Sequence, residues 1–143
     1  MSNGQLEVAV NLTNEKVQFA GISKTNPDRP ITFDYLPPLG DGQGFRGLEL
    51  LLMSFSGCVS TTVVHLLRKQ GRNVSSFRAN AEGVRQELPS VPLKIYLEIV
   101  LESEDTSVSE LEDVVRQAES LSPVWLALKN NIDVVKEYKV VTP

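Results

Sequence analysis

The sequence predicts an α+β fold in which antiparallel sheets wrap around one long, central apolar helix. An apolar segment of helical length lies between Gly47 and Gln70. Segments that alternate polar and apolar residues, as half-buried strands do, come before and after it. Near the C-terminus, apolar residues recur at the spacing of an amphipathic helix. The length of 143 residues fits a single domain, so we expect one domain over residues 1–143.

Residues 1–46 are predicted to form a hairpin and a loop. Two alternating segments separated by a short polar break indicate two antiparallel strands, Gln5–Leu12 and Lys16–Ile22. We expect a turn at Asn26–Pro30, because both prolines bias the residues before them away from helix. A third short strand is expected at Ile31–Tyr35. The following segment, rich in proline and glycine, is predicted to be a loop over Leu36–Gly44.

The central segment, residues 47–71, is predicted to be a helix that ends at Gly71. About 24 residues at ~1.5 Å each make this helix roughly 36 Å long. Its middle is apolar or small on every face, so the helix must be buried on every face. One chain of this length is too small to surround it. We therefore expect a homodimer with the helix at its centre.

The same helix is predicted not to cross a membrane, because seven polar residues interrupt it. These are Glu49, Ser54, Ser56, Ser60, Thr61, Thr62 and His65. The N-terminal residues Met1–Gly4 lack the charged and apolar stretches of a signal peptide. We therefore expect a cytoplasmic protein.

The remaining residues are predicted to form a long hairpin over 73–103, with its turn at Pro89–Pro92, and a C-terminal part over 107–143. Ser107 is expected to cap an amphipathic helix, with Glu110 completing a capping box. Pro123 suits the first turn of a second helix, and the chain is expected to end in the strand Ile132–Val141.

Composition argues against several functional classes. The net charge is −4 with both signs mixed along the chain, so we expect neither a nucleic-acid partner nor an anionic membrane surface. The chain has one histidine, one cysteine and no clustered carboxylates, so we expect no metal site and no cofactor.

Cys58 is the only cysteine, so no internal disulfide can form and its thiol is either buried or reactive. It lies roughly 16 Å from the start of the helix, where the helix dipole no longer acts. A reactive thiol there would need a cation from elsewhere in the fold. Judged by position alone, a packed thiol that behaves as a small hydrophobe is the simpler interpretation.

Other polar residues of this region have structural and functional interpretations. His65 follows Cys58 by two helical turns, about 10 Å, which is too far for direct proton transfer. It is expected to be a polar residue near the end of the helix. Glu49 either stabilises the first turn or belongs to a site. Arg46 is expected to pair with solvent or Glu49, and Trp125 to pack in the core or a dimer interface.

The segment Gly47–Cys58, GLELLLMSFSGC, resembles the helix signature of the OsmC-like family, the osmotically induced and organic-hydroperoxide-resistance proteins. In that signature an acidic residue and an apolar run lead to the first cysteine. The resemblance extends to the preceding loop, the following hairpin and Leu121–Val124. This last segment matches the Cys-Pro segment of the family's second cysteine, with Ser122 at the cysteine position. The resemblance covers essentially the whole chain in order.

The resemblance implies an intertwined homodimer with each active site at the subunit interface. Enzymes of the family reduce organic hydroperoxides: the first cysteine attacks the peroxide, an arginine and a glutamate activate it, and the second cysteine resolves the sulfenic acid. By position, Cys58 would be the peroxidatic thiol. Glu49, nine residues earlier, would be the acidic residue of less characterised members, while Leu48 stands where the hydroperoxide-resistance branch has glutamate.

Two further positions differ from the family pattern. No arginine occurs before Arg29, so the N-terminal hairpin cannot supply the activating guanidinium. Arg29, Arg46 and Arg85 are the alternatives, and we assign the role to Arg29. Ser122 replaces the resolving cysteine, so no intramolecular disulfide can form. Leu52 and Phe55 are predicted to line an apolar substrate pocket, and Ser122 is predicted to be a third substrate-binding residue.

Three functions follow from this pattern. The first is a one-cysteine, peroxiredoxin-like peroxidase in oxidative-stress defence, in which an external thiol rescues the Cys58 sulfenate. The second is a non-catalytic binder, whose interface cavity holds a small apolar or thiol-reactive ligand beside Cys58. The third is a structural dimer with no small-molecule site.

Overall fold

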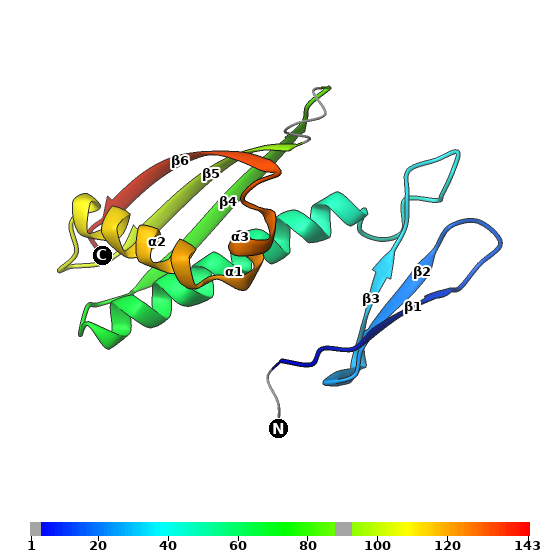
Figure 1. The fold of residues 1–143 in the computed structure, drawn as a ribbon, viewed down its shortest axis with the longest axis horizontal. Helices are drawn as coiled ribbons and strands as arrows, with labels where there is room; N and C mark the ends of the chain where they lie inside the picture. Colours follow the sequence, from blue (N-terminus) through cyan, green and yellow to red (C-terminus); the bar gives the residue numbers. More distant parts are fainter. Residues whose placement is uncertain (1–3, 88–92) are drawn as a thin grey trace. The chain divides into compact units, whose positions relative to one another are not determined.

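The computed structural model describes residues 4–87 and 93–143, so the turn predicted at Pro89–Pro92 lies outside the described residues. The chain forms two compact units, one up to Leu50 and one from Leu51 to Pro143. The first carries strands β1 to β3 and the first residues of the long helix, and the second carries the rest of that helix and the remaining elements (Figure 1).

The first unit is a three-stranded antiparallel sheet of β1 (Val8–Leu12), β2 (Phe19–Ser23) and β3 (Asn26–Phe33). The predicted turn at Asn26–Pro30 is wrong: these residues belong to β3, and the turn is at Lys24–Thr25. The prolines are tolerated because β3 lies at the edge of its sheet and because residues before proline favour extended backbone.

The proline- and glycine-rich loop after β3 is organised by a single buried carboxylate. Asp34 accepts hydrogen bonds from the backbone N–H groups of Tyr35 (2.8 Å), Asp41 (3.2 Å) and Gln43 (3.1 Å). These bonds, led by that from Gln43, lower the pKa of Asp34 against the opposing effect of its burial. Gly40 allows the close approach, since a Cβ there would lie 2.3 Å from Asp34 Oδ1.

Helix α1 (Gly47–Lys69) confirms the predicted central helix. Gly71, which adopts a φ of 75°, lies just beyond its C-terminal end. One face forms a buried row of Phe55, Val59, Val63 and Leu67. The opposite face is exposed along Met53, Ser54, Gly57, Thr61 and His65. Within the second unit, the packed core therefore covers one side of the helix.

The second unit contains a three-stranded sheet in the order β4-β5-β6, built from β4 (Ser76–Arg85), β5 (Leu93–Glu102) and β6 (Ile132–Val141). The β4–β5 hairpin is antiparallel, as predicted, but β6 runs parallel to β5, so this sheet is mixed. The physical reason is the long connection, because a helical crossover returns the chain to the same end of the sheet.

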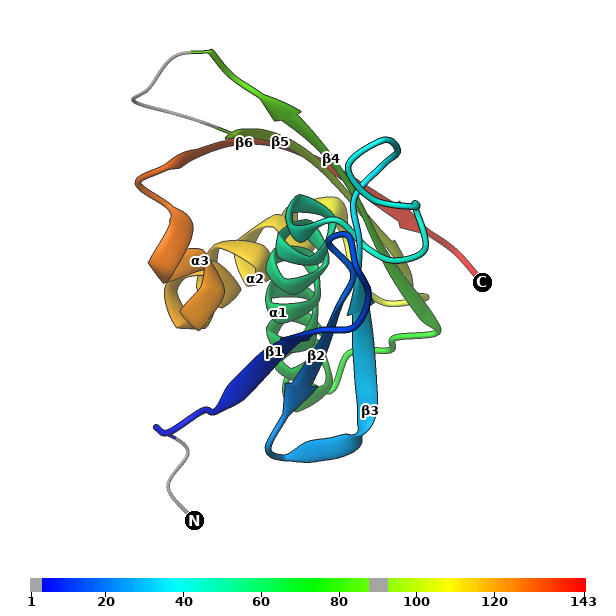
Figure 2. The ribbon, with the colours of Figure 1, turned by 90° about the vertical axis from the view of Figure 1, so that its right-hand side faces the viewer.

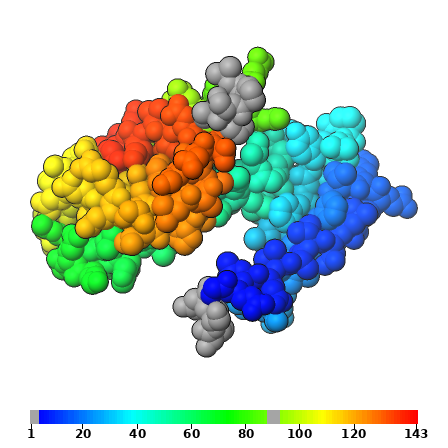
Figure 3. Space-filling view, viewed as in Figure 1, coloured from blue at the N-terminus to red at the C-terminus, as the bar shows by residue number. Residues whose placement is uncertain are grey.

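Two helices, α2 (Val108–Leu121) and α3 (Pro123–Leu128), make this crossover. Ser107 caps α2 as predicted, accepting the N–H of Glu110 at 3.1 Å. The carboxylate of Glu110 pairs with Arg72 at 2.7 Å. Figures 1 and 2 show α1 and α2 side by side on one face of the sheet, and Figure 3 shows α2 and α3 at the surface of this unit.

The core of the second unit lies between these helices and the inner face of the sheet. Alternate residues of β5 supply the sheet side: Leu93, Ile95, Leu97, Ile99 and Leu101. By length and a mean hydropathy of 1.7, α1 also meets the requirements of a membrane span, and 22% of that window is buried. Its buried row joins this core cluster, so α1 is a core helix.

Candidate functional site

The sulfur of Cys58 lies next to a buried hydroxyl group. The Ser122 Oγ–H donates a hydrogen bond to Cys58 Sγ over 3.0 Å. Cys58 is partly exposed, whereas Ser122 is fully buried. The contact therefore places a buried hydroxyl donor directly at the sulfur of the cysteine.

Ser122 is held in place because it ends one helix and begins the next. Its backbone N–H donates to the carbonyl of Ala118, in the last turn of α2, at 2.8 Å. Its Oγ accepts the backbone N–H of Trp125 at 3.4 Å, which makes Ser122 the N-cap of α3. Pro123 occupies the first turn of that helix, where its missing N–H is tolerated.

Two aromatic rings form the apolar side of this region. Phe55 lies one turn before Cys58 on α1 and is fully buried. Its ring centroid is 5.5 Å from that of Trp125, with the planes inclined by 32°. This separation is typical of a favourable aromatic pair. The pair joins α1 to α3, the two helices that supply Cys58 and the N-cap.

A lysine on the inner face of the sheet continues this arrangement, and sequence reasoning missed it. Lys136 of β6 pairs with Glu119 of α2, and both side chains are largely buried. Its ammonium also lies 5.5 Å from the centroid of the Trp125 ring. Nearby, burial raises the pKa of Tyr138, with Lys136 opposing the shift. The available signal was a lysine at an inward-facing position of an alternating strand.

Glu49 makes the local contacts of a helix start. Its carboxylate accepts the backbone N–H of Arg46 at 2.9 Å and the Nε–H at 3.4 Å. The backbone hydrogen bond from Arg46 is the main cause that lowers the pKa of Glu49. The predicted pairing of Arg46 with Glu49 is confirmed. A role for Glu49 at the Cys58 sulfur stays a prediction.

The other predicted site residues lie in different parts of the chain. Arg29 is exposed in β3 of the first unit, so its assignment as the activating cation stays a prediction. Leu52 packs toward β4, since a Cβ on Gly83 would lie 2.9 Å from its Cδ1. The substrate-binding roles of Leu52, Phe55 and Ser122 likewise stay predictions. His65 is exposed.

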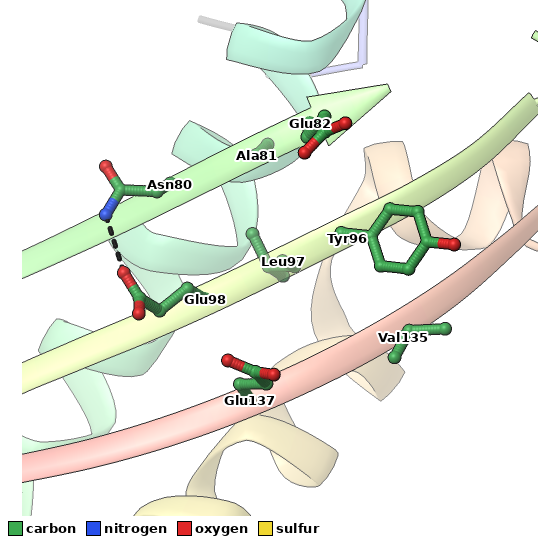
Figure 4. A pocket seen from close by; sticks show the side chains of 8 residues that line it. All are labelled: Asn80, Ala81, Glu82, Tyr96, Leu97, Glu98, Val135 and Glu137. Carbon is green, nitrogen blue, oxygen red and sulfur yellow. Dashed lines mark hydrogen bonds between the residues drawn. The ribbon is translucent and has the colours of Figure 1, made fainter. Parts of the chain in front are cut away.

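A depression of about 330 Å³ lies on the outer face of the β4-β5-β6 sheet (Figure 4). It is lined by Asn80, Ala81, Glu82, Tyr96, Leu97, Glu98, Val135 and Glu137. The Glu98 carboxylate has two partners at this depression: Asn80 donates a hydrogen bond to it at 2.9 Å, and the Lys139 ammonium pairs with it at 3.1 Å. These bonds, led by that from Asn80, lower its pKa. The described residues contain no group of three or more His, Cys, Asp or Glu side chains able to hold a metal.

The fold matches solved structures over nearly the full length of the chain. An OsmC-like protein of Mycoplasma pneumoniae is 19% identical, with a TM-score of 0.81 and coverage of 98% of this chain and 99% of that one. The organic hydroperoxide resistance protein OsmC of Legionella pneumophila is 14% identical, with a TM-score of 0.70 and 99% of each chain covered. That of Elizabethkingia anophelis, with thiocyanate bound, is 14% identical, with a TM-score of 0.74 and 99% of each chain covered.

At these identities the solved structures show the fold alone. No curated protein matches the chain. The model of the OsmC-like protein family, however, matches residues 40–137, which is more than half of the sequence. This match includes the start of α1, Cys58 and Ser122. On this ground the chain belongs to the family of OsmC-like proteins.

Proposed function

We propose that this protein is a one-cysteine thiol peroxidase that reduces organic hydroperoxides. The observation that carries the proposal is the 3.0 Å hydrogen bond from the Ser122 hydroxyl to Cys58 Sγ. A peroxide-related role is supported by the OsmC-like family of the chain and by similar solved structures that are named as organic hydroperoxide resistance proteins. Ser122 stands where the resemblance places the second cysteine of the family, and its hydroxyl contacts Cys58, which stands at the position of the first cysteine.

The reaction follows from the chemistry of a single thiol. The Cys58 thiolate attacks the distal oxygen of ROOH, the O–O bond breaks, and the leaving alkoxide takes a proton to give ROH. Cys58 becomes a sulfenic acid. One external thiol converts it to a mixed disulfide and releases water. A second external thiol restores the Cys58 thiol and leaves as the oxidised disulfide. Two electrons thus pass from two thiols to one hydroperoxide.

The remaining site residues are proposed from the sequence. Arg29 and Glu49 would activate the thiol and the peroxide, and Leu52 and Phe55 would contact the apolar part of the hydroperoxide. We assign the protein to the cytoplasm, where a thiol such as Cys58 stays reduced and low-molecular-weight thiols are abundant. The reaction needs neither a metal nor an organic cofactor.

We also propose that residues 1–143 act as a single domain and that two copies form a homodimer around α1. Gly57 supports this assembly. It lies within α1, where glycine costs about 1 kcal/mol relative to alanine. A Cβ at Gly57 would have no heavy atom within 4 Å, so the chain itself does not require glycine there. Close approach of a second copy would require it.

The direct test is consumption of cumene hydroperoxide with dithiothreitol as reductant. We expect turnover by the wild type, loss of turnover in Cys58→Ser, and a dimedone adduct at Cys58 after oxidation. Ser60→Ala, on the same helix, is the matched control and should keep activity. Turnover that survives Cys58→Ser would exclude this mechanism.

The alternative function is a binder whose cavity holds an apolar ligand beside Cys58. It is favoured if the wild type leaves cumene hydroperoxide intact and Cys58 remains a free thiol. Cumyl alcohol, which cannot oxidise a thiol, should then bind in a calorimetric titration. Absence of both turnover and binding would leave only a structural role for the dimer.

A further inference from the structure

Lys136 lies in an unusual position for a lysine. Its neighbours on the inner face of β6 are Ile132, Val134, Tyr138 and Val140, which pack against the core. The Lys136 side chain is 22% exposed, and that of its ion-pair partner Glu119 is 14% exposed. Holding a charge at such a position has a desolvation cost, which the ion pair offsets. A nonpolar residue would fill this position without that cost.

The Lys136 ammonium has a second partner besides the carboxylate. It lies over the indole ring of Trp125 at 5.5 Å from the centroid, within the range of a cation–π contact. Lys136 therefore links three elements, β6, α2 and α3, through one group. A partly buried ammonium with two fixed partners restricts where the indole ring can lie.

Trp125 in turn is connected to Cys58 by two routes. Its backbone N–H donates to Ser122 Oγ at 3.4 Å, and that hydroxyl donates to Cys58 Sγ at 3.0 Å. Its ring packs against Phe55, one turn before Cys58 on α1. Both routes depend on the placement of the first turn of α3. A shift of Trp125 would therefore move the hydroxyl relative to the sulfur.

We propose that Lys136 is a positioning residue for the Cys58 site. By fixing the indole of Trp125, it holds the N-cap of α3 so that the Ser122 hydroxyl stays directed at the Cys58 sulfur. This proposal deepens the proposed peroxidase function. It rests on that function only for what the reactive sulfur is used for. Lys136 itself does not act on the substrate.

The test uses the chain's single cysteine and single tryptophan as reporters. The main variant is Glu119→Gln/Lys136→Met, which removes both charges and avoids an unpaired buried carboxylate. Lys136→Arg is the conservative variant, because it keeps the charge. Lys139→Met is the control. Lys139 belongs to the same strand as Lys136 but lies on the outer face of the sheet, where it pairs with Glu98 of β5.

We expect the double variant to fold, to change the emission of Trp125, and to slow alkylation of Cys58 by iodoacetamide at constant pH. The expected decrease is roughly two- to tenfold, the range of one net hydrogen bond. Lys136→Arg should retain most of the wild-type rate, and Lys139→Met should match the wild type. Circular dichroism and urea unfolding of each variant report whether the fold is kept.

A double-mutant cycle separates positioning from a general structural effect. In a Ser122→Ala background the Lys136 substitutions should no longer alter the alkylation rate, because the hydroxyl through which they act is gone. An unchanged rate in the double variant, or the same decrease in the Ser122→Ala background, would overturn the proposal. Alkylation requires no hydroperoxide, so these outcomes do not depend on whether the peroxidase proposal holds.

Discussion

The hydroxyl of Ser122 donates to the sulfur of Cys58 across 3.0 Å, although 64 residues separate them along the chain. The contact exists because α1 and the α2–α3 junction are packed on the same face of one sheet. It gives the lone cysteine a buried polar partner in place of a second thiol. Because Cys58 is the only cysteine of the chain, it cannot form an internal disulfide.

Ser122→Cys is expected to create that disulfide. The two sulfurs would lie close enough to bond after a small side-chain adjustment, and mild oxidation should then remove both free thiols. Closing a loop of this size stabilises the protein by up to about 4 kcal/mol in the chain-entropy model. Thiol titration and non-reducing mass spectrometry measure the bond. Ser120→Cys, on the exposed side of α2, is the control and should keep both thiols free.

Ser122→Ala is expected to lower stability and slow alkylation of Cys58. The variant loses the N-cap of α3 and the hydroxyl donor at the sulfur, with a cost of about 1–2 kcal/mol in urea unfolding. Ser107→Ala is the matched control, because Ser107 caps α2. It should show a comparable loss of stability with no change in the alkylation rate. Equal alkylation rates for both variants would mean that the Ser122 hydroxyl has no influence on the thiol.

Asp34→Asn is expected to destabilise the first unit in a pH-dependent way. The pKa of Asp34 is lowered in the folded state from 3.8, mainly by the backbone bond from Gln43. A lowered pKa means that the stabilisation is fully present above the unfolded value and is lost as the pH falls through the folded value. Urea unfolding should therefore separate wild type and variant at neutral pH and bring them together on acidification.

Asp28→Asn is the control for this experiment, since Asp28 is exposed in β3 of the same unit. Its stability should follow that of the wild type at every pH. A constant difference between wild type and Asp34→Asn down to the acid limit would contradict the role given to the carboxylate.

Gly57→Leu is expected to break the proposed dimer. Light scattering should give the mass of two chains for the wild type and of one chain for the variant, because the leucine side chain would meet the second copy. Val135→Leu, on the exposed outer face of the sheet, is the control and should remain dimeric. A wild-type mass of one chain at micromolar concentration would exclude the dimer outright.

Local sequence patterns determined much of the fold. Helix α1 follows from its composition and from the glycine just beyond its end, Gly71. The start of α2 follows from the Ser107 cap, and the burial of β5 from its alternating pattern. These are interactions between residues near in sequence, so periodicity and capping describe them. The prolines of β3 misled the same reasoning, because an edge strand accepts residues that an interior strand would not.

Only the tertiary structure decided which distant groups meet. The parallel pairing of β6, the contact of Ser122 with Cys58, and the buried pair of Lys136 and Glu119 join segments that no local pattern connects. The resemblance indicated that Ser122 belongs near Cys58, but the separation of hydroxyl and sulfur depends on how α1 and α3 pack. The sequence determined which helices and strands form, because short-range periodicity specifies burial. The surroundings of the thiol required the folded chain, because long-range packing alone sets the distances between their atoms.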